Sequence, residues 1–148
     1  MKKRRRAREL ALQRLYSLEI SGNSFHTVSK ELSADCNGDV EIETFALELL
    51  RLCVENQEML DKEVTGMVQN WEYKRIALVD RLILRLALCE MLYFNEIPPK
   101  VTMNEAIELA KMYSTEQSGR FVNGILDSTY KKYHSESRIH KTGRGLLT

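Results

Sequence analysis

The chain has 148 residues and a formal net charge of +1, a length that fits one folded domain with a real core. Hydrophobic residues make up 43% and charged residues 29%, which excludes a disordered chain. The charge is distributed unevenly: +6 over residues 1–8, −9 over 9–130 and +4 over 131–148. A basic end on an acidic body indicates a nucleic-acid or membrane partner for that end.

The apolar pattern argues against a membrane protein and a secreted protein. The longest apolar stretch, 76–94, contains four charged residues and falls short of the ~18 apolar residues that a spanning helix needs. Polar residues also interrupt 9–19, where a signal peptide would be apolar. Three widely spaced cysteines fit reduced thiols, so we expect a cytoplasmic protein.

Few helix breakers occur in the first half of the chain, and apolar residues recur there at helical spacing. We expect a first helix over 5–20 with Ala7, Ala11 and Leu15 on its inner face, ended by Gly22. A short second helix over 24–36, a turn at 37–39 and a long third helix over 40–68 follow.

The second half contains three further predicted helices. The fourth, over 73–95, is apolar nearly all round, which predicts a central buried helix stopped by Pro98 and Pro99. Thr102 and Glu105 form a capping-box pattern that would open the fifth helix. A second capping-box pattern at 114–117 would open the sixth, whereas 134–148 lack periodicity and are expected to form a flexible basic tail.

Together these elements predict an all-α fold. We expect a single helical domain over 5–133, packed as a compact bundle of about six or seven helices, preceded by a basic arm at 1–8. The fifth helix would face inward through Met103, Ala106 and Tyr113, among others.

The basic arm is the strongest functional signal. Six of the seven positions 2–8 are cationic, and guanidinium groups bind phosphates bidentately and stack on bases. A solvated tail without a ligand is the alternative interpretation. A membrane-surface role is weaker, because the following helix shows no exposed apolar face.

Helical geometry adds an aromatic residue to this signal. At about 100° per residue, Arg5, Glu9, Leu12 and Tyr16 would share an outward stripe. A tyrosine beyond an arginine cluster is typical of a stacking platform beside a phosphate clamp. Tyr16 as a half-buried rim residue is the other interpretation, and Gln13 would lie near Arg6 on the adjoining stripe.

Catalytic and metal-binding motifs are missing from the sequence. The histidines and cysteines lack metal-ligand spacing, and no phosphate loop or nucleophile elbow occurs. We therefore expect no catalytic residue, no metal site, no cofactor and no enzyme activity. Arg81 and Arg85, four residues apart on the apolar fourth helix, have two open interpretations: internal salt bridges, or a wet stripe with Asp80 that meets a protein partner.

Several segments, taken together, resemble the NusB family of bacterial transcription antitermination proteins. The matching motifs are RRARELALQRLY at 5–16, DRLILRLA at 80–87, IPPKV at 97–101, NEAIELAK at 104–111 and FVNGILD at 121–127. They are specific and ordered, and they cover about two-thirds of the chain. The match is weak over 22–40 and after Tyr133.

The resemblance implies a fold and a function. It implies two packed helical sub-bundles that bind the single-stranded boxA RNA of ribosomal-RNA transcripts together with the ribosomal protein NusE. The assembly would join the antitermination complex of RNA polymerase and suppress premature termination. A homodimer is also compatible with the family.

The resemblance further implies which residues act. RNA would be contacted by the arginine-rich start, by the first-helix tyrosine and by the start of the FVNG helix. These residues are Arg4, Arg5, Arg6, Arg8, Gln13, Tyr16, Arg120, Phe121 and Asn123. NusE would meet the region around Asp80, with Arg81 and Tyr16 nearby.

Two alternatives remain beside an RNA-binding adaptor. One is a helical protein-interaction module without sequence-specific RNA binding. The other is an accessory to ribosomal-RNA processing or methylation, because NusB-like domains also occur fused to methyltransferases.

Overall fold

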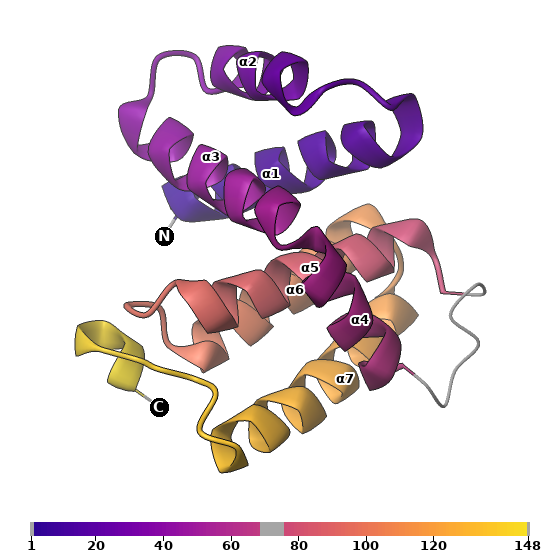
Figure 1. Cartoon of the computed structure of the whole chain (residues 1–148), viewed down its shortest axis with the longest axis vertical. Helices are drawn as coiled ribbons and strands as arrows, with labels where there is room; N and C mark the ends of the chain where they lie inside the picture. Colours follow the sequence, from indigo (N-terminus) through magenta and orange to yellow (C-terminus); the bar gives the residue numbers. More distant parts are fainter. Residues whose placement is uncertain (1, 69–75, 148) are drawn as a thin grey trace. The chain divides into compact units, whose positions relative to one another are not determined.

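The structure, a computed structural model, describes residues 2–68 and 76–147, and within them the regular elements are all helices. They are α1 (Lys2–Ser21), α2 (Phe25–Asp35), α3 (Val40–Glu55), α4 (Gln57–Met67), α5 (Leu78–Tyr93), α6 (Pro99–Tyr113), α7 (Glu116–Ser135) and the short 3-10 helix η2 (Gly143–Leu146). The expected all-α fold is confirmed (Figure 1). The chain divides into two compact units, 1–57 and 58–148.

In the first unit, α1, α2 and α3 pack against one another. All three contribute fully buried apolar side chains, which include Leu10, Ala11, Leu15, Val28, Leu32, Ala46, Leu49 and Leu50. Leu12 is also buried, with 3% of its surface exposed. The prediction that Leu12 lies on an outward stripe of this helix is therefore wrong.

Helix α1 begins at Lys2, three residues before the predicted start, so most of the basic cluster is helical. Arginine and lysine are good helix formers, and contacts with α3 and its cap hold this first turn. Lys3 Nζ lies 3.3 Å from Asp39 Oδ2 and 3.2 Å from Glu41 Oε2. These carboxylates, Glu41 first, raise the pKa of Lys3.

The predicted turn between α2 and α3 is confirmed. Asn37 and Gly38 adopt positive φ values of 50° and 79°, a conformation that favours glycine and asparagine. Asp39 then caps α3, because its carboxylate accepts a hydrogen bond from the Ile42 amide at 3.1 Å.

The long helix predicted over 40–68 is wrong, because the structure breaks it into α3 and α4 at Asn56. The Asn56 backbone leaves helical geometry, and its side-chain Nδ2 donates to the Leu52 carbonyl at 2.9 Å. Asparagine side chains compete with the backbone for such hydrogen bonds, which is why they favour helix ends.

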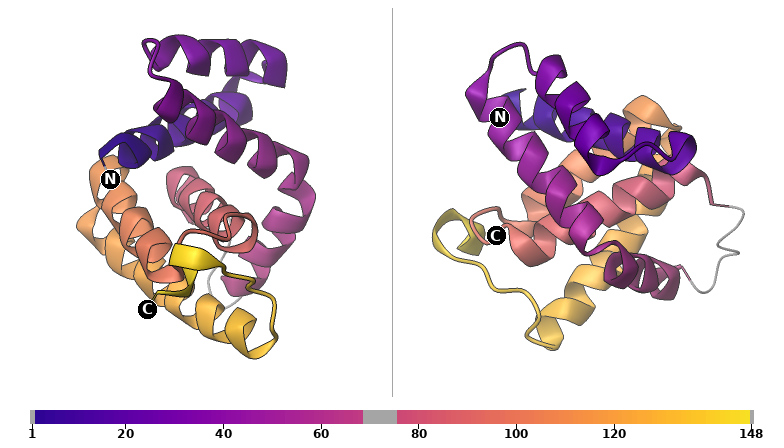
Figure 2. Two further views of the ribbon diagram at one scale, coloured as in Figure 1. Left: turned by 90° about the vertical axis from the view of Figure 1, so that its left-hand side faces the viewer. Right: turned by 45° about the horizontal axis from the view of Figure 1, so that its top comes forward.

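In the second unit, α6 packs against both α5 and α7 (Figure 2). Leu82 to Met91 of α5 are all buried, which confirms that this helix is mostly buried. The core is completed by Leu60 and Val64 from α4, Leu109 and Ala110 from α6, and Val122 and Leu126 from α7.

Helix α5 begins at Leu78 and is therefore shorter than the predicted helix over 73–95. Positions 73–75 of that prediction lie outside the described residues. It ends at Tyr93, before the proline pair, and Pro99 opens α6 as its first residue. Proline fits there because the first helical turn does not need its missing N–H.

Thr102 does not open α6, so the predicted capping box with Glu105 is wrong. It lies one turn inside the helix, where its hydroxyl donates to the buried Glu90 carboxylate of α5 at 2.8 Å. The local sequence resembles a capping box, but the Thr102 side chain instead makes a tertiary hydrogen bond to α5. The expected inward position of Tyr113 is also wrong, since this side chain is exposed.

The C-terminal segment differs from the expected flexible tail, because several contacts attach it to the second unit. Arg138 Nη2 donates to Glu63 at 2.8 Å, Lys141 Nζ donates to the Phe94 carbonyl at 2.8 Å, and the Thr142 amide donates to the Asn95 carbonyl at 2.9 Å. The segment returns to the turn between α5 and α6, as Figure 2 shows. Gly145 then packs so tightly that a Cβ would lie 1.9 Å from Asn95 O.

No helix in the described part of the chain is long and apolar enough to cross a membrane.

Candidate nucleic-acid interface

The exposed face of α1 carries cations, an amide and an aromatic ring. Arg6, Glu9, Gln13 and Tyr16 follow one another at spacings of three and four residues, so they share a helical face. Arg6 and Gln13 are exposed, and 42% of the Tyr16 surface is accessible. The stripe thus runs through Gln13 instead of the buried Leu12, and Arg5 lies exposed beside it.

Arg4 and Arg8 have a structural contact that the sequence did not reveal. Their guanidinium carbons lie 4.7 Å and 5.2 Å from the ring centroid of Phe45 on α3, within cation–π range. Arg8 is also buried, with 5% of its surface exposed. We therefore remove Arg8 from the set of accessible phosphate ligands, because its position between α1 and α3 is a packing position.

The start of α7 presents a second candidate surface. Arg120 and Asn123 are exposed and lie three residues apart on one face, whereas Phe121 is half-buried. The sequence predicted all three as RNA contacts, and the structure leaves Arg120 and Asn123 exposed and Phe121 partly accessible.

A network of hydroxyl groups around the buried Ser118 fixes the start of this helix. Ser118 Oγ donates to Asp80 Oδ2 at 2.9 Å and lies within hydrogen-bond distance of the Ser114 and Thr115 hydroxyl groups, at 2.9 Å and 3.1 Å. Thr115 Oγ1 in turn accepts from the Ser118 amide at 3.0 Å, so Thr115, not Ser114, caps α7. The network ties α5 to the residues immediately before Arg120.

Asp80 is consequently unsuited to direct contact with a partner protein. Only 6% of its surface is exposed, and its carboxylate is oriented by Ser118. Arg85 is also buried and pairs with Asp61 of α4 at 2.6 Å, which favours the internal salt bridge over the wet stripe at that position. Arg81 is half-buried, and more accessible than these two neighbours.

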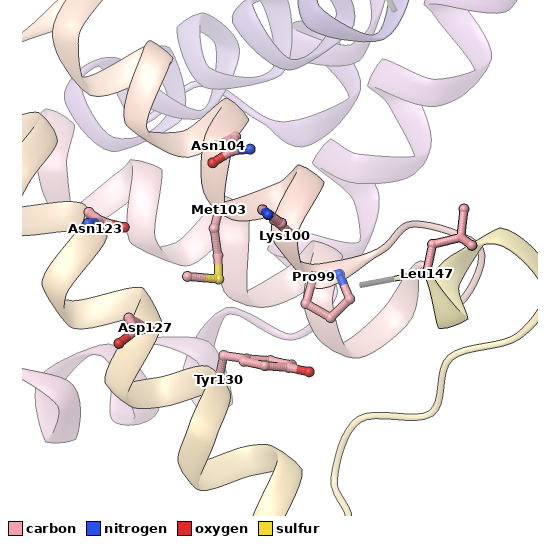
Figure 3. Close-up of a pocket in the computed structure, with 8 residues that line it drawn as sticks. All are labelled: Pro99, Lys100, Met103, Asn104, Asn123, Asp127, Tyr130 and Leu147. Carbon is pink, nitrogen blue, oxygen red and sulfur yellow. The ribbon is translucent and has the colours of Figure 1, made fainter.

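A groove of about 620 Å³ lies against Asn123, farther along α7 (Figure 3). Its walls come from the first turns of α6, the middle of α7 and the C-terminal segment. The lining residues are Pro99, Lys100, Met103, Asn104, Asn123, Asp127, Tyr130 and Leu147. Only Asn123 among them was predicted to contact a ligand, although the spacing of Arg120, Asn123, Asp127 and Tyr130 was a detectable helical stripe.

Metal-binding geometry does not occur among the described residues: no three histidine, cysteine or acidic side chains there are grouped to hold an ion. Cys36, Cys53 and Cys89 are all buried, and none of the three forms a disulfide bond.

Comparison with known proteins identifies the sequence family. The family model for NusB matches residues 5–131. The transcription antitermination protein NusB of Chloroherpeton thalassium is 41% identical to this chain, over 97% of this chain and 69% of that one. The protein of the same name from Salinibacter ruber is 40% identical, over 99% of this chain and 92% of that one.

Solved structures give the same answer. The chain resembles T. maritima NusB with a TM-score of 0.80 and 36% identity, over 91% of this chain and 95% of that one. It also resembles a chain in a crystal structure of the antitermination factors NusB and NusE in complex with dsRNA, with a TM-score of 0.81 and 28% identity, over 90% of this chain and 99% of that one.

The motifs quoted above, the helical fold and these matches agree over nearly the whole sequence. Such membership classes the protein with transcription antitermination proteins and not with enzymes. The chain belongs to the NusB family.

Proposed function

We propose that this protein is an RNA-binding antitermination factor that recognises the boxA segment of ribosomal-RNA transcripts together with the ribosomal protein NusE. It acts by holding the nascent RNA, so that the complex stays attached to the elongating polymerase. RNA binding requires no catalytic group, only cations for phosphates, exposed rings for bases and a second protein to add specificity.

One observation carries the proposal: the accessible stripe of α1 that combines Arg6, Gln13 and Tyr16. Arginine binds phosphate, an amide pairs with base edges and a tyrosine ring stacks on a base. The three chemistries that single-stranded RNA requires therefore lie on one helical face. Arg5 beside this face, and Arg120 with Phe121 on α7, are the further RNA contacts that we propose.

For NusE, the support comes from the relative whose crystal structure contains NusB, NusE and dsRNA. In the second unit we assign the NusE contact to the accessible Arg81 instead of the buried Asp80, and in the first unit Tyr16 is a separate candidate. That complex also contains double-stranded RNA, so the test below includes a duplex.

The experiment is a binding titration with fluorescently labelled single-stranded boxA RNA, a scrambled RNA of equal composition and a boxA duplex, each with and without NusE. We expect tighter binding of single-stranded boxA than of the scramble, and a further gain when NusE is present. Tyr16→Ala is expected to weaken boxA binding by ~1–3 kcal/mol through loss of one stacked base.

The matched control is Tyr93→Ala, which removes an exposed tyrosine far from the proposed stripe in sequence. Equal affinity for boxA and scrambled RNA, combined with intact NusE binding, would instead identify a protein-interaction module. Equal loss in both tyrosine variants would show that Tyr16 has no special contact with RNA.

A further inference from the structure

The groove between α6, α7 and the C-terminal segment has the composition of a site for one unpaired RNA base. We propose that a base of the bound RNA inserts into this groove, between the ring of Tyr130 and the apolar side chains of α6. The inference deepens the proposed function and depends on it, because the ligand is part of the same RNA.

The shape of the groove suits a flat ring. Its volume of about 620 Å³ falls in the range of small-molecule sites. In Figure 3 the Met103 side chain points from α6 toward α7, and the Tyr130 ring lies across from it, with Pro99 at the same end. One aromatic wall and one apolar wall are the arrangement in which bases stack.

Neighbouring contacts hold these walls in place. The Tyr130 ring centroid lies 5.8 Å from that of His134, at an interplanar angle of 33°, so Tyr130 has an aromatic neighbour on its own helix. Leu147 closes the end of the groove, and it follows the segment that Lys141 and Gly145 attach to the turn between α5 and α6.

Polar groups around the opening match the edges of a base. The amides of Asn104 on α6 and Asn123 on α7 each offer donors and an acceptor, and both residues are exposed. The Asp127 carboxylate can accept from a base amino group, and Lys131 at 3.0 Å balances its charge. Lys100 supplies one ammonium group for a phosphate.

The mixture of charges argues against a purely anionic ligand. A free phosphate would meet Asp127 as well as Lys100, whereas a nucleotide presents a neutral base and a separate anionic phosphate. Four of the eight lining residues carry a charged or amide side chain, and such groups pair with the edges of a base.

The groove is also continuous with the proposed RNA surface. Arg120, Asn123, Asp127 and Tyr130 lie at spacings of three, four and three residues, so they form one stripe along α7. Ten residues of helix cover ~15 Å, which lets a strand that contacts Arg120 reach the Tyr130 ring.

The test is a double-mutant cycle between protein and RNA, with the full chain and single-stranded boxA RNA in which each nucleotide in turn is replaced by an abasic one. The protein variants are Tyr130→Ala, Tyr130→Phe and the matched control Tyr113→Ala, an exposed tyrosine of α6 outside the groove. We expect Tyr130→Ala to weaken binding at least five-fold, Tyr130→Phe to bind like the wild type and Tyr113→Ala to change little.

The decisive result is one RNA position where the abasic change lowers the affinity of the wild type at least five-fold but does not lower the affinity of Tyr130→Ala any further. Absence of such a position overturns the proposal, and so does full affinity in Tyr130→Ala. Weakened NusE binding with unchanged RNA binding would instead assign the groove to a protein partner.

Failure of the broader function is distinguishable from failure of the groove. If the wild type does not prefer boxA over scrambled RNA, the proposed function is wrong. If that preference holds and Tyr16→Ala reduces binding while all groove variants do not, only the groove proposal is wrong. Thermal unfolding of each variant verifies that it is folded.

Discussion

At the scale of single residues, Glu63 is the anchor of the C-terminal segment. Its carboxylate accepts hydrogen bonds from the Tyr133 hydroxyl at 2.6 Å and from Arg138 at 2.8 Å, and the Arg138 guanidinium lies 4.2 Å from the Tyr133 ring centroid. Burial alone would raise the pKa of Glu63, but Arg138 and Tyr133 outweigh it and lower that pKa. Burial and the nearby Glu63 raise the pKa of Tyr133.

This lowered pKa gives a pH dependence with a definite sign. Below the ordinary glutamate pKa of 4.5, the unfolded chain binds a proton that the folded chain still lacks, so the folded state loses stability as the pH falls. The stabilisation is present above pH 4.5 and disappears as the pH drops through the lower, folded pKa. We expect Glu63→Gln to reduce this acid dependence.

Denaturant unfolding between pH 6 and pH 3 measures this acid dependence of stability. The control is Glu58→Gln, which removes an exposed carboxylate of the same helix. The wild type and the control should lose free energy of unfolding more steeply than Glu63→Gln. Parallel curves for all three proteins would contradict the assignment.

At the scale of an element, the start of α7 is held by hydroxyl groups. Ser118→Ala would leave the buried Asp80 carboxylate without its Ser118 donor and would remove one member of the Thr115 cap network. We expect it to lower the free energy of unfolding by ~1–3 kcal/mol, because a buried charged acceptor loses a hydrogen bond.

Chemical denaturation with Ser17→Ala as the control tests this, since the Ser17 hydroxyl donates to the Gln13 carbonyl of its own helix and not to a distant element. Surface changes of that kind normally fall within ~0.5 kcal/mol. A cost for Ser118→Ala no larger than for Ser17→Ala would mean that the network adds nothing to stability.

Helices and turns were predictable wherever local chemistry decides them. Apolar spacing gave α2 and the burial of α5, and Asn37 with Gly38 gave the turn before α3. The start of α1 and the role of Thr102 were not predictable, because each depends on a contact with a residue far away in the sequence. The break at Asn56 depends on a local hydrogen bond to Leu52, which the regular apolar spacing around it concealed.

The candidate site was predictable in composition but not in accessibility. Charge along the chain predicted a site on the first helix, yet Arg8 and Phe45 are 37 positions apart, and no local pattern links them. The buried position of Asp80 has the same explanation, since its partner Ser118 is 38 positions away. Sequence patterns reveal which residues are charged, whereas tertiary packing decides which of them remain accessible.

At the scale of the whole molecule, the separation of charge predicts how RNA binding responds to salt. If about five phosphates are neutralised, the logarithm of the affinity should fall with the logarithm of the salt concentration at a slope of roughly −3 to −4, because single strands release ~0.7 counterion per phosphate. Arg6→Ala should make that slope shallower by ~0.7.

Arg8→Ala provides the contrast, because its buried position on Phe45 predicts a loss of stability and an unchanged slope. Titrations of boxA RNA from 50 to 300 mM salt measure both variants. A slope near zero for the wild type would argue against phosphate binding, and equal slope changes would argue against the packing role of Arg8.

The close approach of Gly145 to the Asn95 carbonyl means that the end of the chain can lie against the α5–α6 turn only where position 145 has no side chain. A Cβ at position 145 would collide with this backbone oxygen, so either the α5–α6 turn or the segment that carries Lys141 and Arg144 would have to move, whereas Glu63 would still hold Arg138. Gly145→Ala therefore offers an uncharged way to detach this segment, in which every ionisable group is retained and only its location changes.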